Sequence, residues 1–154
     1  MKEKLYTIPL NDAVNASDEC PFCFIERELE QNSLDFVLGN SSSYMESDIR
    51  DQTDKAGFCR VHMKKMFDYG NTLGNALILQ THYHKLREEM KKQFDSFSPG
   101  KSSILARFHR SDSSTDKNPI AAWTASKDCS CFICQNIDDT FKRYVETFFW
   151  LYRQ

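Results

Sequence analysis

The sequence lacks the patterns that predict β-strands and membrane-spanning helices. None of its segments shows a sustained alternation of apolar and polar residues, which is the signature of a half-buried strand. The apolar run near its end, Phe148–Tyr152, is much shorter than the roughly 18 residues of a membrane-spanning helix. We therefore predict an all-α protein that does not enter a membrane.

The chain also lacks an excess of charge and a targeting signal. Its 20 basic and 22 acidic residues give a formal net charge of −2, and no arginine-rich run is present, so we expect no nucleic-acid partner. The opening MKEKLYTIPLNDAV has neither the apolar region nor the cleavage site of a signal peptide. These absences predict a cytoplasmic protein, in which closely spaced cysteines are metal ligands or redox groups rather than disulfides.

Sequence motifs of the common enzyme classes are missing as well. The chain has no phosphate-binding loop, no dinucleotide-binding fingerprint, no G-x-S-x-G serine motif and no H-E-x-x-H zinc-protease motif. The sequence therefore favours a binding or scaffold protein over an enzyme.

What the sequence does contain is a set of paired metal-ligand residues. Cys20-Pro-Phe-Cys23 is followed downstream by Cys59-Arg-Val-His62. Three thiols and one imidazole make a complete tetrahedral ligand set for zinc, and four protein ligands leave no position for a reactive water. We predict a structural zinc site formed by Cys20, Cys23, Cys59 and His62.

A second cysteine pair, Cys131-Phe-Ile-Cys134, is a candidate for an incomplete second metal site. Two ligands do not fill a tetrahedral site, so further donors are needed. The histidines available for this are His82, His84 and His109. The alternative is that Cys131 and Cys134 are free thiols.

Other chemistries also suit these cysteines. Cys20-Pro-Phe-Cys23 is similar to a thioredoxin-type motif, in which the helix N-terminus activates the first thiol. That motif normally belongs to a βαβ unit, so thiol–disulfide exchange by Cys20 and Cys23 is the alternative function. An iron–sulfur cluster held by both cysteine pairs would leave the C-x-x-H motif without a role. Buried cysteines that only pack as small apolar residues are the remaining interpretation.

Helical periodicity marks most of the chain. Apolar residues recur every three or four positions over 22–38, over Leu79–Phe97 and after Cys134. A capping box at Ser43-x-x-Glu46 predicts a short helix that ends near residue 55. Residues 1–12 are expected to be extended, because they contain Pro9.

The helices divide into two units. Residues 1–97 form the first, residues 98–118 are rich in Ser, Asp and Lys and predict a linker or mobile loop, and residues 119–154 form the second. Both C-x-x-C motifs run directly into a long amphipathic helix, so the second unit is a partial repeat of the first. Its own C-x-x-H would fall at about position 170, whereas the chain stops at Gln154 within a helical pattern. We therefore expect either a truncated product or another partner for the second cysteine pair. The predicted fold is an all-α, zinc-stapled helical bundle with a partial second repeat.

Several segments of the chain carry a family resemblance. They are MKEKLYTIPLNDA, the CPFC motif, SYMESDIRDQTDKAGFCRVH, NTLGNALILQTH and CFICQNIDDTFKRYVETFFWLY. Together they resemble a family of uncharacterised bacterial proteins that is catalogued only as a domain of unknown function. The resemblance covers most of the chain outside 98–118, and it implies longer members with a second Gly-Phe-Cys-x-x-His. It implies no activity.

The last helical segment carries more aromatic surface than one stripe can bury. Its aromatic residues are Phe141, Tyr144, Phe148, Phe149, Trp150 and Tyr152. Soluble monomers rarely expose apolar patches larger than a few hundred Å². We therefore predict a homodimer built on the helix that begins at Cys134. An unidentified protein partner is also expected.

Overall fold

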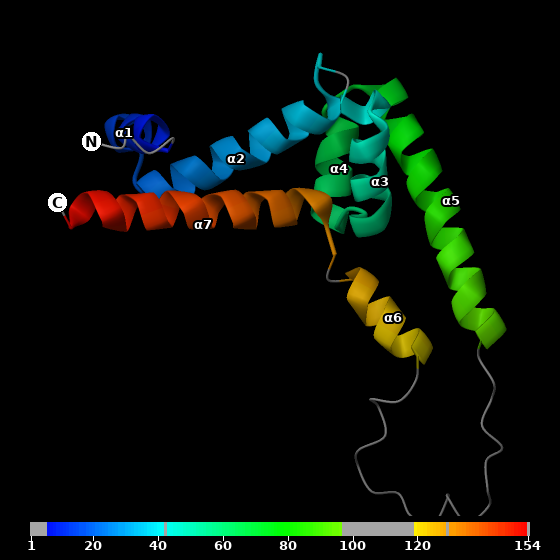
Figure 1. Ribbon diagram of the computed structural model, residues 1–154. Coiled ribbons are helices and arrows are strands. Elements are labelled where there is room, and N and C mark those ends of the chain that lie inside the picture. The colour runs from blue at the N-terminus through cyan, green and yellow to red at the C-terminus, as the bar shows by residue number, and fades with distance from the viewer. Residues whose placement is uncertain (1–5, 42, 97–118, 129, 154) are drawn as a thin grey trace, which may run out of the picture.

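The computed structural model describes residues 6–41, 43–96, 119–128 and 130–153, and within these ranges the chain forms helices and no strand. In chain order the elements are α1 (Thr7–Asn15), α2 (Pro21–Leu38), the 3-10 turn η1 (Ser43–Met45), α3 (Ser47–Ala56), α4 (Arg60–Asp68), α5 (Thr72–Ser96), α6 (Pro119–Asp128) and α7 (Phe132–Tyr152) (Figure 1). The all-α prediction is confirmed. The whole of the predicted linker, 98–118, lies outside the described residues.

Two long helices, α2 and α7, lie side by side and run in opposite directions (Figure 1). Near the start of α7, Asn136 Nδ2 donates a hydrogen bond to Ser33 Oγ in the second half of α2, at 3.0 Å. Near its end, the ring of Phe148 packs edge-on against Phe22 in the first turn of α2, with ring centroids 5.1 Å apart. The antiparallel arrangement thus places the N-termini of the two helices at opposite ends of the pair.

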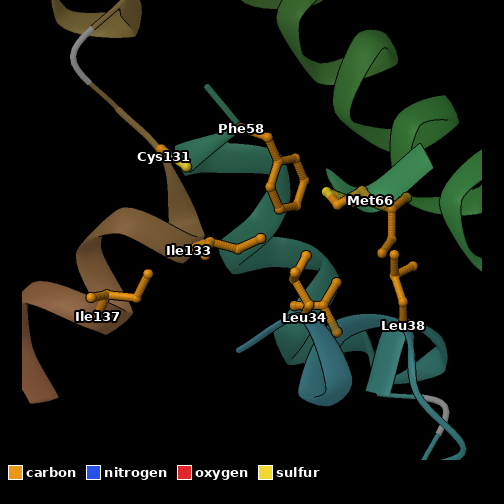
Figure 2. Close-up of a cluster of buried hydrophobic side chains, with 9 residues drawn as sticks. Leu34, Leu38, Phe58, Met66, Cys131, Ile133 and Ile137 are labelled. Atoms are coloured by element: carbon orange, nitrogen blue, oxygen red, sulfur yellow. The ribbon is translucent and has the colours of Figure 1, made fainter. Parts of the chain in front are cut away.

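The main core lies where the start of α7 meets α2, α4 and α5. Its buried residues are Leu34, Val37, Leu38, Phe58, Met66, Ile78, Cys131, Ile133 and Ile137. Figure 2 shows the side chains of Leu34, Phe58 and Ile133 converging from three segments of the chain. Because Cys131 belongs to this core and Cys134 packs against it, the core fixes the position of both metal-ligand candidates at the start of α7.

The structure differs from the sequence prediction at the N-terminal end, where α1 replaces the expected extended arm. Pro9 is the third residue of α1. The first N–H groups of a helix have no helical acceptor, so a proline in the first turn removes no hydrogen bond. Leu10 and Ala13 are buried in a second cluster with Tyr144, which explains why the segment is helical. Residues 1–5 of this prediction lie outside the described residues.

Short local motifs fix the helix ends. Pro21 is the first residue of α2, where its missing N–H and fixed φ are favourable. Asn71 accepts a hydrogen bond from the N–H of Gly74 at 2.9 Å and donates one to the carbonyl of Leu38 at 2.7 Å. It thereby joins the start of α5 to the end of α2. In the described ranges, no helix is both long enough and apolar enough to cross a membrane.

Candidate metal centre

Four side chains from two distant segments form a compact group. Cys59 and His62 come from the start of α4, and Cys131 and Cys134 from the start of α7. One ligand atom from each residue lies within 4.8 Å of all the others. In the part of the chain that the structure describes, this is the one group of three or more Cys, His, Asp or Glu residues arranged to hold a metal ion.

The spacing of the donor atoms fits a tetrahedral ion. Nδ1 of His62 lies 3.3 Å from Sγ of Cys59, 3.3 Å from Sγ of Cys131 and 3.4 Å from Sγ of Cys134. The sulfurs of Cys59 and Cys134 are 4.0 Å apart. Zinc bonds of about 2.3 Å to sulfur and about 2.0 Å to nitrogen place tetrahedral donors roughly 3.5–3.8 Å from one another. Small side-chain adjustments would therefore bring all four donors to bonding distance.

A backbone hydrogen bond holds the two ligand-bearing turns together. Cys59 and Cys131 are the N-caps of α4 and α7, and each has extended backbone angles. The N–H of Phe132, next to Cys131, donates to the carbonyl of Gly57 at 2.9 Å. The pairing of the two turns is thus part of the backbone structure and does not depend on the side chains alone.

Gly57 is required at this point of the chain. Its φ of +66° with ψ of −160° belongs to a region that only glycine adopts readily. A Cβ atom there would also lie 2.7 Å from Cε1 of His82. His82 is 7% exposed, and its Nδ1 lies 3.1 Å from the carbonyl oxygen of Asp54, so this imidazole packs beneath the turn. Of the other two histidines considered from the sequence, exposed His84 pairs with Glu88 on the surface, away from the group. His109 lies outside the described residues.

Two of the four residues are buried, and a carboxylate contacts the imidazole from the side opposite the sulfurs. His62 is 6% exposed and Cys131 is 3% exposed. Nε2 of His62 lies 3.0 Å from Oε1 of Glu30 on α2, and Glu30 also pairs with Lys65. A carboxylate accepts hydrogen bonds, so this contact favours the tautomer that has its proton on Nε2 and the lone pair of Nδ1 toward the three sulfurs. Carboxylates in this position orient metal-binding histidines in many proteins.

The pKa values of the Cys59 and Cys134 thiols are shifted in opposite directions. Burial raises the pKa of Cys134 to about 12, and the neighbouring thiols of Cys131 and Cys59 add to the effect. Burial also raises the pKa of Cys59, but the backbone N–H of His62 and the other two thiols outweigh it, so the pKa of Cys59 is lowered overall. A divalent cation would balance the negative charge of the three thiolates.

An acidic cavity reaches the group from the surface. It has a volume of about 500 Å³ and lies between α2, α4 and α7, with Cys59, His62 and Cys134 in its wall and Cys23 also among its lining residues. The carboxylates of Glu26, Glu30 and Asp138 also line it. Negative charge along an approach path raises the local concentration of cations.

Comparison with protein families assigns the chain. A family model described as "Family of unknown function (DUF6062)" matches residues 1–154. The chain belongs to this family. The match confirms the resemblance seen in the sequence. No curated protein and no solved structure matches this DUF6062 chain.

The structure groups the ligands of this DUF6062 chain differently from the sequence analysis, which joined Cys59 and His62 to Cys20 and Cys23. Cys59 and His62 lie with Cys131 and Cys134, and Cys20 and Cys23 lie outside the group. Glu30, which contacts His62, is two turns beyond Cys23 along α2. At 1.5 Å per residue this is about 10 Å, so α2 carries the first cysteine pair away from α4.

A comparison of helix lengths is the sequence signal that favours the observed grouping. The 18 residues of α2 rise about 27 Å, and the 10 residues of α3 can return about 15 Å of that distance. The C-x-x-H motif at the end of α3 therefore reaches the middle of α2 and falls short of its cysteines. The C-x-x-C of α7 reaches the same place because α7 runs antiparallel to α2.

Proposed function

We propose that the chain is a zinc-binding helical scaffold, with the ion held by Cys59, His62, Cys131 and Cys134. The observation that supports this most strongly is the convergence of three sulfurs and Nδ1 of His62, with distances of 3.3–3.4 Å between Nδ1 and each sulfur. Nothing in packing alone requires four polar side chains from two distant segments to meet in this way.

The donor chemistry selects the metal. Thiolates and imidazole favour zinc and other soft divalent ions, whereas calcium and magnesium take oxygen ligands. Three cysteines and one histidine in a tetrahedron form a common structural zinc set. With all four positions filled by the protein, the ion has none left for a substrate or a reactive water. The proposal is therefore a structural role rather than a catalytic one.

The ion would link the N-terminus of α4 to the N-terminus of α7. Zinc binding by small zinc-finger peptides is worth about 10–16 kcal/mol and drives their folding. Here the buried core around Ile133, Met66 and Ile78 also joins these helices. Loss of the ion should therefore loosen the contact of α7 with α4 without unfolding every helix. A rigid all-α module of this kind suits binding to another protein.

Metal analysis combined with thermal unfolding tests this function. Relative to wild type, Cys131→Ser should lose about one zinc ion per chain and melt at a lower temperature. Cys20→Ser is the matched control, because it removes a cysteine outside the group and should keep the ion of the group. A Cys131→Ser protein with the zinc content and stability of wild type would contradict the proposal.

Thiol–disulfide exchange at Cys20 and Cys23 is the second candidate function. The N–H of Cys23 donates to Sγ of Cys20 at 3.3 Å, and this contact, with that of the Cys23 thiol, lowers the pKa of Cys20. A lowered pKa at a helix N-terminus is the property of an attacking thiol. Reduction of a small disulfide by the zinc-loaded protein, abolished in Cys20→Ser, would support this function. Absence of turnover would exclude it.

A further inference from the structure

The Cys20–Cys23 turn is constructed like the turns that carry the candidate metal centre. Cys20 and Cys131 are both N-caps of long helices, with φ and ψ of −142° and 114° and of −157° and 123°. The second cysteine of each pair follows in the first helical turn. In the Cys20 turn the N–H of Cys23 also donates a hydrogen bond to Sγ of Cys20, at 3.3 Å, a side-chain cap that Cys59 and Cys131 do not make. The first pair thus shares the N-cap position and the extended backbone of the Cys131 turn.

Cys20 and Cys23 supply two donor atoms, and a tetrahedral metal site needs two more. Among the described residues, no third Cys, His, Asp or Glu approaches Cys20 and Cys23 closely enough to form a group. A tetrahedral ion held here would have two positions to fill. Cys23 is exposed, so a second molecule can reach the site.

Exposed apolar residues lie on the two helices next to the start of α2, although the immediate neighbours of Cys23 include the charged Glu26 and Arg27. The start of α2 lies beside α1 and the end of α7 (Figure 1). At this end of the molecule Ile8 and Val14 of α1 are 72% and 60% exposed, and Phe149 and Tyr152 of α7 are 52% and 82% exposed. Exposed apolar residues on helices next to an incomplete ligand set favour a contact surface at this end of the molecule.

We propose that Cys20 and Cys23 bind a zinc ion together with the same two cysteines of a second copy of the chain. A two-fold axis through the ion would supply four thiolates from two identical turns, and it would place the apolar ends of the two copies against each other. Each thiol that binds as a protonated group gives up its proton to the solvent, and no redox change occurs. A second copy is the simplest occupant, because it brings a matching pair of donors and a matching apolar surface.

Light scattering and metal analysis of the full chain test the proposal. The measurements use micromolar protein with added zinc alone and a phosphine reductant, which prevents disulfide-linked dimers. Wild type should have about twice the chain mass of 18.0 kDa and carry about 1.5 zinc ions per chain. The double variant Cys20→Ser/Cys23→Ser should have the mass of one chain and carry about one ion, held by the candidate metal centre.

Three results would overturn this inference. They are a wild-type protein with the mass of one chain, a second ion bound by a single chain, and a dimer that persists in the double variant. The zinc content of the double variant separates the two proposals. If it is about one ion per chain, the centre formed by Cys59, His62, Cys131 and Cys134 stands whatever the mass measurement gives.

Discussion

Nε2 of His62 lies 3.0 Å from Oε1 of Glu30, so a carboxylate on α2 orients an imidazole on α4. This contact turns Nδ1 toward the sulfurs of Cys59, Cys131 and Cys134. It also connects the candidate metal centre to a third helix, which contributes no ligand of its own. A residue that contacts a ligand without binding the ion, as Glu30 does, should therefore affect metal affinity nearly as strongly as some ligands do.

Replacing Glu30 should weaken zinc binding. Glu30→Ala removes the acceptor of the Nε2 proton, and we expect the affinity to fall by about 10- to 100-fold. Glu30→Gln keeps an oxygen acceptor, so its zinc affinity should fall less than that of Glu30→Ala. Competition with a chromophoric zinc chelator measures both variants, and Glu28→Ala, an exposed change on the same helix, is the control. Wild-type affinity in Glu30→Ala would show that the carboxylate does not orient the ring.

Replacing Gly57 should destabilise the turn that carries Cys59. Gly57→Ala forces a side chain into a glycine-only backbone region, at a cost of about 1–3 kcal/mol, and pushes the new Cβ against His82. Chemical denaturation should show a lower free energy of unfolding, and zinc affinity should fall with it.

Gly70 offers a matched control for this change. Its φ is +90°, but no atom lies within 4 Å of a Cβ added there. Gly70→Ala should therefore show the effect of backbone strain alone and leave zinc affinity unchanged. Equal effects of the two alanines on zinc binding would mean that the Gly57 turn does not position the ligands.

Zinc binding should release protons. Because burial and the neighbouring thiols raise the pKa of Cys134 to about 12, this thiol keeps its proton at neutral pH until a metal displaces it. We expect at least one proton released per ion, and an affinity that falls as the pH is lowered. Calorimetric titration in two buffers with different ionisation enthalpies gives the number of protons released per zinc ion. A binding enthalpy independent of the buffer would contradict the prediction.

The raised pKa of Cys134 should also make the stability of the metal-free protein depend on pH in the alkaline range. A thiol whose pKa is raised in the folded state favours folding in its protonated form. That contribution is complete below the ordinary thiol pKa of 9.0, and it is lost as the pH rises toward about 12. Metal-free protein should therefore become less stable in this range, whereas zinc-loaded protein, with no proton on Cys134, should not show the same loss.

The helices were predictable because their signals are local. The apolar stripes of α2 and α7, the Gly57 that ends α3 and the Asn71 that begins α5 all act within a few residues of the chain. α1 was missed because a general rule about proline was applied to a first-turn position, where the rule does not hold. Burial of Leu10 against α7, which a sequence does not display, decides the helical conformation of that segment.

The residue types of the candidate metal centre were predictable, but its grouping was not. The C-x-x-H motif and both cysteine pairs stand out in the sequence. Which pair joins Cys59 and His62 depends on the antiparallel packing of α2 and α7, and this packing is a tertiary property. The hydrogen bond from Phe132 to Gly57 joins residues far apart in the chain, and no motif spacing indicates it.

X-ray absorption of the zinc-loaded Cys20→Ser/Cys23→Ser variant tests the central claim most directly, because it removes the pair that the sequence favoured as ligands. The account predicts about one ion per chain, with three sulfur neighbours at about 2.3 Å and one nitrogen at about 2.0 Å. A variant that binds no zinc, or a shell without three sulfurs and one nitrogen, would contradict the assignment of Cys59, His62, Cys131 and Cys134.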